Sequence, residues 1–87
     1  MKYVDRHVFR EERFSLGFEE TTGKYYLSIP VANPYVEYEE HYEIDLDQYE
    51  ACPANLDQLK EIAAKSRARQ NDSRLMVKPG RLRGSPV

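Results

Sequence analysis

The sequence predicts one α+β domain: an antiparallel sheet of three or four strands in meander order, with one C-terminal helix packed on one face. Two observations predict this fold. Apolar and polar residues alternate with the period of a half-buried strand over three stretches of the first half of the chain. A later stretch spaces its apolar residues by three or four, as an amphipathic helix does. We expect residues 1–78 to form the domain and residues 79–87 to form a flexible basic tail.

A tight turn joins the first two predicted strands. The first strand lies in RFSLGFEE, where apolar residues alternate with polar or small ones. The segment TTGK follows, and its Gly23 can adopt the positive φ that a hairpin turn needs. The second strand lies in KYYLSIPV, and its apolar face comprises Tyr25, Leu27, Ile29 and Val31. Pro30 has no amide hydrogen, so its amide side should face solvent or a bulge near a strand end.

The third predicted strand lies in VEYEEHYEID, which holds four glutamates and one histidine in ten residues. Its apolar face comprises Val36, Tyr38, Tyr42 and Ile44, and its polar face comprises Glu37, Glu39, His41 and Glu43. Glu40 falls on the apolar face, where an unpaired buried carboxylate would be costly. We therefore expect either a bulge that turns Glu40 outward or a position near the sheet edge.

Helix signals follow the third strand. The pairs Asp45 with Gln48 and Asn55 with Gln58 have the spacing of helix N-termini, which predicts a short helical turn and then a longer helix. The longer helix has an apolar stripe that can cover the sheet: Leu56, Leu59, Ile62, Ala63 and Ser66. Residues 75–77 form an apolar run that suits a short last strand. Residues 1–12 fit either a strand or an amphipathic turn, so we assign no element there.

The net charge of -2 conceals opposite charges in the two parts of the chain. Residues 14–57 hold ten acids and one base, which gives -9, whereas residues 58–87 hold eight bases and two acids, which gives +6. The single cysteine, Cys52, allows no internal disulfide. No apolar segment is long enough for a signal peptide core or a membrane span. We expect a soluble cytoplasmic protein with no membrane partner.

The glutamates and the histidine of the third strand suggest catalysis or metal binding at first sight. Alternate residues of one strand lie about 6.5 to 7 Å apart, so their carboxylates project in parallel rather than converge on one point. The chain also lacks a Gly-rich phosphate loop, a paired-cysteine motif, HExxH and GxSxG. We therefore expect no catalytic residue, no metal site and no cofactor. His7 is interpreted as a surface residue and Cys52 as a small packing residue.

An acidic sheet face that carries tyrosine suits a basic protein partner, because carboxylates steer and pair with Lys and Arg while tyrosine adds rigid contact area. The predicted partner-binding residues are Glu19, Tyr26, Glu37, Glu39, Glu40 and Glu43. The segment FSLGFEETTGKYYLSIPVANPYVEYEEHYEID, followed by one helix, resembles the small acidic immunity proteins of bacterial contact-dependent growth inhibition and related polymorphic toxin systems. This resemblance implies a non-catalytic protein that neutralises one cognate toxin domain, often a nuclease, by binding over or beside its active site.

Two other functions remain open at this point. The basic C-terminal segment could contact phosphates, which would make the chain a small nucleic-acid-associated regulator. The bases concerned are Arg67, Arg69, Arg74, Lys78, Arg81 and Arg83. The acidic segment would repel a polyanion, so we expect no direct nucleic-acid contact. The third alternative is a small enzyme that uses His41 or Cys52.

Overall fold

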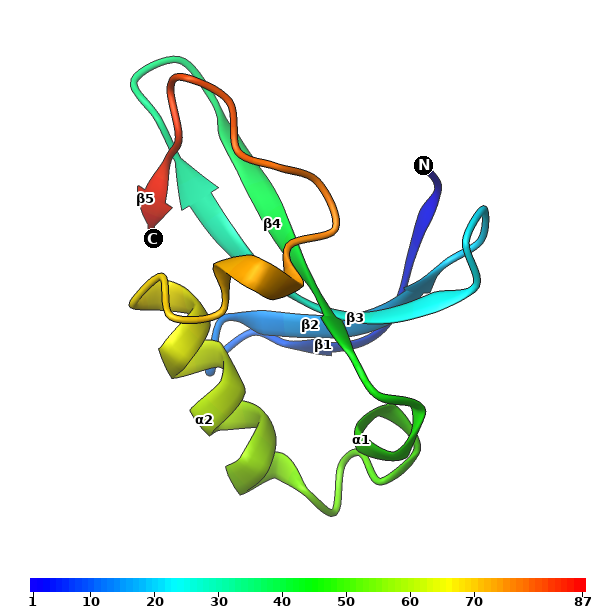
Figure 1. Cartoon of the computed structure of the whole chain (residues 1–87). Coiled ribbons are helices and arrows are strands. Elements are labelled where there is room, and N and C mark those ends of the chain that lie inside the picture. Colours follow the sequence, from blue (N-terminus) through cyan, green and yellow to red (C-terminus); the bar gives the residue numbers. More distant parts are fainter.

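Five strands form one antiparallel sheet, and two helices lie between its fourth and fifth strands in the chain (Figure 1). The computed structural model describes all 87 residues. The strands are β1 (Tyr3–Phe9), β2 (Phe14–Glu19), β3 (Lys24–Ala32), β4 (Glu37–Ile44) and β5 (Ser85–Pro86). The helices are α1 (Leu46–Glu50) and α2 (Leu56–Arg67), and a short 3₁₀ turn, η1, covers Asp72–Arg74. The predicted α+β class is confirmed.

The first four strands are arranged as a meander, in the order β1-β2-β3-β4, because each pairs antiparallel with the next. Gly23, in the turn between β2 and β3, has a φ of 71°, as the TTGK segment predicts. β4 is an edge strand of this path, and β5 pairs with β3 instead. The predicted meander is therefore confirmed, with a short fifth strand added at the end of the chain.

Apolar residues of neighbouring strands align on one side of the sheet, which we call the core face. Leu16 pairs with Leu27, and Leu27 pairs with Tyr42. The helix α2 covers this face, and its Leu59 and Ala63 have no exposed surface. Each large aliphatic side chain buried here contributes about 1.5 to 3 kcal/mol. The buried cluster comprises Phe14, Leu16, Leu27, Ile29, Val31, Tyr42, Ile44, Leu59 and Ala63, which confirms the predicted sheet face and helical stripe.

Both predicted helix starts are found. The side-chain oxygen of Gln48 accepts a hydrogen bond of 2.9 Å from the backbone amide of Asp45, which satisfies a free donor at the start of α1. The helix α2 begins directly after Asn55, whose side-chain amide donates to Gln58 Oε1 at 3.1 Å. Spacing of cap residues therefore located the first residue of both helices.

Residues 1–12, which the sequence leaves unassigned, contain the strand β1. It pairs with β2 from Tyr3 to Phe9, with a register shift between Asp5 and His7. The residue at this irregularity, Arg6, places its guanidinium carbon 5.0 Å from the centroid of the Phe18 ring, where a cation–π attraction stabilises it. The bulge therefore explains why simple alternation does not identify this strand.

Pro30 occupies a gap in the hydrogen-bonding ladder of β3. The pairing of β2 with β3 reaches Ser28, and the pairing of β5 with β3 begins at Val31. Pro30 lies between these two partners, and its carbonyl accepts a bond of 3.2 Å from the amide of Val87. No strand therefore requires the amide hydrogen that proline lacks, which agrees with the prediction from sequence.

The C-terminal segment packs against the sheet, so the domain boundary expected at residue 78 is not seen. Leu75 forms a single bridge with Tyr42, in place of the short strand expected at residues 75–77. The chain then runs alongside β4 and ends in β5 (Figure 1). Gly84 is buried because its backbone lies against Ala32, and a Cβ at this position would come within 2.7 Å of that backbone. Neither helix is long and apolar enough to cross a membrane.

Candidate protein-binding face

Exposed carboxylates gather on the side of the sheet away from α2, which we call the outer face. Glu37, Glu39 and Glu43 of β4 are exposed there, as alternation along the strand predicts. Asp5 of β1 is a fourth exposed acid on this face, and sequence analysis missed it because β1 was not assigned. The register places Asp5 opposite Gly17, Gly17 opposite Tyr26, and Tyr26 opposite Glu43. These four acids form the acidic face.

Two of these acids, Glu39 and Glu43, interact with neighbouring polar or charged side chains. Glu39 accepts a hydrogen bond of 3.1 Å from the Ser28 hydroxyl. Partial desolvation, together with repulsion from Asp5, raises the pKa of Glu39 above its ordinary value. Glu43 forms an exposed ion pair of 3.4 Å with Lys24, the single base of residues 14–57. The acidic face remains strongly negative because one exposed lysine offsets only one of its four carboxylates.

Tyr26 lies on the outer face, but its side chain is fully buried and does not contribute contact area. Its hydroxyl donates a hydrogen bond of 2.6 Å to Asp5 Oδ1. The ring can lie over β2 because Gly17 has no side chain, and a Cβ there would be only 2.5 Å from Tyr26 Oη. Burial and the bond to Asp5 raise the pKa of the phenol well above its ordinary value. The expectation that Tyr26 forms part of the exposed surface was therefore wrong.

Glu19 is also fully buried, contrary to its expected place on the partner-binding surface. Its carboxylate accepts four hydrogen bonds, from the amides of Lys2 (2.8 Å), Thr21 (2.7 Å) and Thr22 (2.7 Å) and from the Thr22 hydroxyl (2.7 Å). Burial alone would raise the pKa of Glu19, but these donors hold it well below its ordinary value. Glu19 therefore organises the β2–β3 turn and the start of β1.

Glu40 lies on the core face and is 7% exposed, so it too is unavailable to a partner. The register of β4 is continuous, which excludes the bulge, and the edge position of β4 is the alternative that holds. The negative charge of Glu40 is balanced by Arg83, whose Nε lies 2.7 Å from Glu40 Oε2. The Tyr42 hydroxyl donates to the other carboxylate oxygen at 2.7 Å. An acid on the core face is therefore paired rather than displaced.

Arg83 joins Glu40 to η1. Its terminal nitrogens lie 2.8 and 2.9 Å from the two carboxylate oxygens of Asp72. The bonds from Arg83 hold the pKa of Asp72 below its ordinary value. The Arg83 side chain is only 12% exposed and carries one positive charge against two carboxylates. We call Glu40, Asp72 and Arg83 the C-terminal ion network.

His41 packs within an aromatic cluster on the outer face. Its ring stacks on Tyr3 with centroids 3.7 Å apart and planes 13° apart, and it meets Tyr26 edge-on at 4.7 Å. Burial lowers the pKa of His41 to about 4, although the nearby negative charge of Asp5 acts in the opposite direction. The imidazole is therefore uncharged near neutral pH.

Acidification between pH 6.5 and about 4 should destabilise the protein through His41. The unfolded chain binds this proton more tightly than the folded chain, so the free energy of unfolding falls as the pH drops. The contribution of one such group approaches about 1.4 kcal/mol per pH unit. Urea unfolding from pH 7 to pH 4 checks this. His41→Phe should flatten the pH dependence, His7→Gln should preserve it, and an unchanged slope in His41→Phe would contradict the assignment.

The two residues of the small-enzyme alternative lie on different sides of the sheet. Cys52 packs against the core cluster, where burial raises the pKa of its thiol. His41 lies on the outer face, stacked on Tyr3. A nucleophile and its base must lie within hydrogen-bond reach, so these two residues do not form such a pair. No group of three or more histidine, cysteine, aspartate or glutamate side chains is placed to hold a metal ion.

Most of the arginines considered for phosphate binding make contacts within the protein. Arg67 donates to the carbonyls of Glu12 (2.7 Å) and Arg13 (2.8 Å), which ties the end of α2 to the β1–β2 turn. Arg69 and Arg74 donate to backbone carbonyls at 3.4 and 3.5 Å, and Arg83 belongs to the C-terminal ion network. The other two bases of that set, Lys78 and Arg81, are exposed, as are Arg69 and Arg74.

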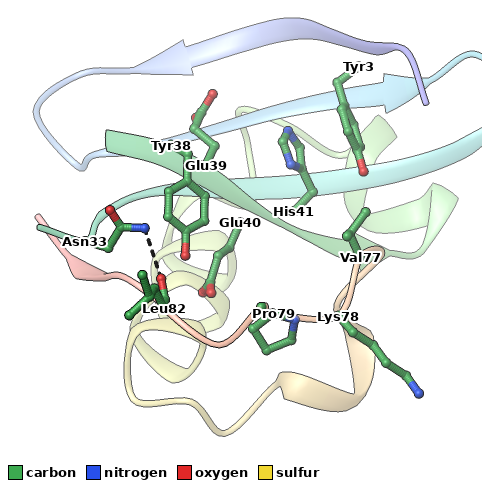
Figure 2. A pocket seen from close by; sticks show the side chains of 11 residues that line it. Tyr3, Asn33, Tyr38, Glu39, Glu40, His41, Val77, Lys78, Pro79 and Leu82 are labelled. Carbon is green, nitrogen blue, oxygen red and sulfur yellow. Dashed lines mark hydrogen bonds between the residues drawn. The ribbon is translucent and has the colours of Figure 1, made fainter. Parts of the chain in front are cut away.

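A groove of about 500 Å³ lies between β4 and the segment 77–82, which we call the strap (Figure 2). From the sheet, Tyr38, Glu39 and His41 line it, and Tyr3 lies at one end. The strap lines the other side with Val77, Lys78, Pro79, Gly80 and Leu82. The carbonyl of Leu82 accepts a bond of 3.0 Å from the Asn33 side chain, which holds the strap in place.

Comparison with known proteins finds no match to a family model, to a curated protein or to a solved structure.

Proposed function

We propose that the chain is a non-catalytic protein-binding module that neutralises a basic partner, as an immunity protein neutralises its toxin domain. The observation that carries this proposal is the acidic face, in which three exposed glutamates of one strand and Asp5 of a second strand point away from the helix. Such a face steers a positively charged protein surface toward it and pairs with Lys and Arg on contact. The preferred partner class is a nuclease, because a cleft that binds a polyanion must be positive.

Neutralisation would follow from occupation of the partner's cleft. Glu37, Glu39 and Glu43 would take the positions of substrate phosphates beside the partner's basic residues. Tyr3 and Tyr35 would add contact area, since Tyr35 is 81% exposed in the β3–β4 turn. Neither tyrosine belongs to the core cluster, and Tyr3 was not considered as a partner-binding residue from the sequence.

Direct nucleic-acid binding has less support. Four of the six bases that would contact phosphates are engaged with carbonyls or carboxylates of the same chain. Of the two remaining bases, Lys78 lines the groove together with Glu39, whose negative charge would repel a polyanion. These contacts favour a role for the C-terminal bases in holding the fold.

Reversal of Glu37, Glu39 and Glu43 to lysine should weaken partner binding by about 100-fold or more, because attraction becomes repulsion at three positions. The test partner is any toxin domain encoded beside the gene for this chain, and affinity is measured by calorimetry at two salt concentrations. A matched control reverses three exposed acids elsewhere, Glu11, Glu50 and Asp57, and should bind within a few-fold of the wild type. Equal affinity of both triple variants, or the lack of any adjacent toxin domain, would overturn the proposal.

A further inference from the structure

We propose that the free part of the β4 edge, with the groove beside it, binds an extended basic segment of the partner protein as an added strand. This inference rests on the proposed function, because it names the part of the partner that the acidic face recognises. Peptides that add a strand to a sheet edge gain affinity from backbone hydrogen bonds and specificity from alternate side chains.

The chain itself shows that backbone groups of this edge can pair with another segment. The amide of Met76 donates a bond of 2.9 Å to the carbonyl of His41, and Leu75 forms a bridge with Tyr42. The contact between the two segments ends there, because the chain leaves the edge at Val77 and passes through Pro79 in the strap. Only one end of the edge is therefore used by the chain's own residues.

The unused end presents backbone groups to the groove. In an antiparallel strand, the amide and carbonyl of every second residue point to the same side. His41 points its carbonyl to the outer edge, and the register of β4 is continuous, so Glu39 and Glu37 point their backbone groups that way too. The strap does not pair with them. Beyond it, the hydrogen bonds to β4 go to side chains, from Arg83 to Glu40 at 2.7 Å and from the Gly84 amide to the Tyr38 hydroxyl at 2.7 Å.

The groove lies between Glu39 and the strap and provides space for an occupant. Its volume of about 500 Å³ is within the range of ligand-binding clefts. Figure 2 shows Tyr38 and Glu39 on the sheet side and Val77 and Leu82 on the strap side. Val77 and Leu82 are 59% and 57% exposed, so an added strand would cover apolar surface as well as backbone.

The negative charge beside the β4 edge determines which kind of strand can bind there. The edge is flanked by Glu37 and Glu39, and Lys78, the single lysine or arginine of the groove lining, points its ammonium away from the sheet (Figure 2). A second copy of the chain would place these acids opposite acids, and like charges directly opposite across two strands are destabilising. A partner segment with Lys or Arg at alternate positions places opposite charges together. The occupant is therefore a basic segment of another protein.

Synthetic nine-residue peptides test the edge directly. The probe alternates Lys and Val, with blocked termini, and the comparison peptide replaces every Lys by Glu. A third peptide repeats the probe with N-methyl groups on two adjacent central residues, which removes one backbone donor from each edge of the strand. Amide hydrogen exchange by NMR follows Glu37 and Glu39. We expect the probe to slow both amides at least about 10-fold, the N-methylated peptide to bind at least about 10-fold more weakly, and the Glu peptide not to bind.

Variants of one residue separate the backbone from the charge. Glu39→Pro removes an edge-facing amide hydrogen, which edge strands tolerate, whereas Glu39→Gln removes only the charge. The proline variant should lose most of the probe affinity, and the glutamine variant should lose it in part. Thermal unfolding verifies that both variants fold, and the N-methylated peptide decides the question on the wild-type protein if the proline variant does not.

Each outcome separates the inference from the proposed function. Charge-dependent binding of toxin domain and probe, with unchanged exchange at Glu37 and Glu39, overturns the added strand and leaves the acidic face as the binding surface. Slowed exchange with the probe but no binding of any adjacent toxin domain supports the edge site and overturns the immunity role. Slowed exchange without peptide, in a dimer seen by sedimentation, identifies a second copy as the occupant and overturns the inference.

Discussion

Replacement of Arg83 by alanine is expected to lower the free energy of unfolding by about 3 to 5 kcal/mol, because a buried carboxylate loses its partner. Glu40 is 7% exposed, and its two remaining contacts do not carry a positive charge: the Tyr42 hydroxyl and the surrounding core. For a domain of this size the midpoint of thermal unfolding should fall by more than about 10 °C. Differential scanning calorimetry at pH 7 measures both quantities.

Two further variants give this prediction its controls. Arg81→Ala removes an exposed arginine of the same segment and should change the stability by less than about 0.5 kcal/mol. The double variant Arg83→Met with Glu40→Leu replaces the buried pair by apolar side chains and should recover most of the loss, since such replacements are often neutral. If Arg83→Ala were as stable as the wild type, residues 79–87 would be the flexible tail that the sequence predicts.

Replacement of Gly17 by alanine is expected to destabilise the protein by at least about 2 kcal/mol, because the new methyl group has no space. It would overlap the backbone carbonyl oxygen of Val4 in the paired strand, and it would lie 2.5 Å from Tyr26 Oη and 2.7 Å from Tyr26 Cζ. A backbone atom cannot rotate away as a side chain can, so β1 would have to separate from β2. Urea unfolding followed by circular dichroism measures the loss.

Gly80→Ala is the matched control, because nothing lies within 4 Å of a Cβ at that position. It should change the stability by less than about 0.5 kcal/mol. Tyr26→Phe removes only the contact with the hydroxyl and leaves those with the ring carbon Cζ and with the carbonyl of Val4. Gly17→Ala should remain strongly destabilising in the Tyr26→Phe background. Near-wild-type stability of Gly17→Ala would show that the β1–β2 pairing differs from the structure described here.

The local sequence pattern was sufficient to predict properties that depend on a single helix, strand or turn. Alternation along β4 predicted that Glu37, Glu39 and Glu43 are exposed, because successive side chains of a strand point to opposite faces. Helical spacing predicted the buried stripe with Leu59 and Ala63. The positive φ of Gly23 needed only the residue type and the turn. In each case the cause lies within a few residues.

Residues whose state depends on distant partners were predicted wrongly or not at all. Glu19 alternates onto the polar side of its strand, yet four donors from the next turn and from the N-terminus surround it. Tyr26 is buried because the register sets it against a glycine of the neighbouring strand. The predictions that Glu19 and Tyr26 are exposed were wrong because alternation indicates the face of the sheet on which a side chain lies, and not which residues cover that face.

The sequence alone determined the class of the fold, the order of its main strands, the start of both helices and the exposed glutamates of β4. Only the tertiary structure determined that Glu40 stays on the core face, because its compensating charge comes from Arg83, 43 residues away along the chain. The same contact places the C-terminal segment beside β4 and leaves the groove between them. Spacing rules cover neighbours within an element, whereas a buried ion pair depends on which distant segments the fold brings together.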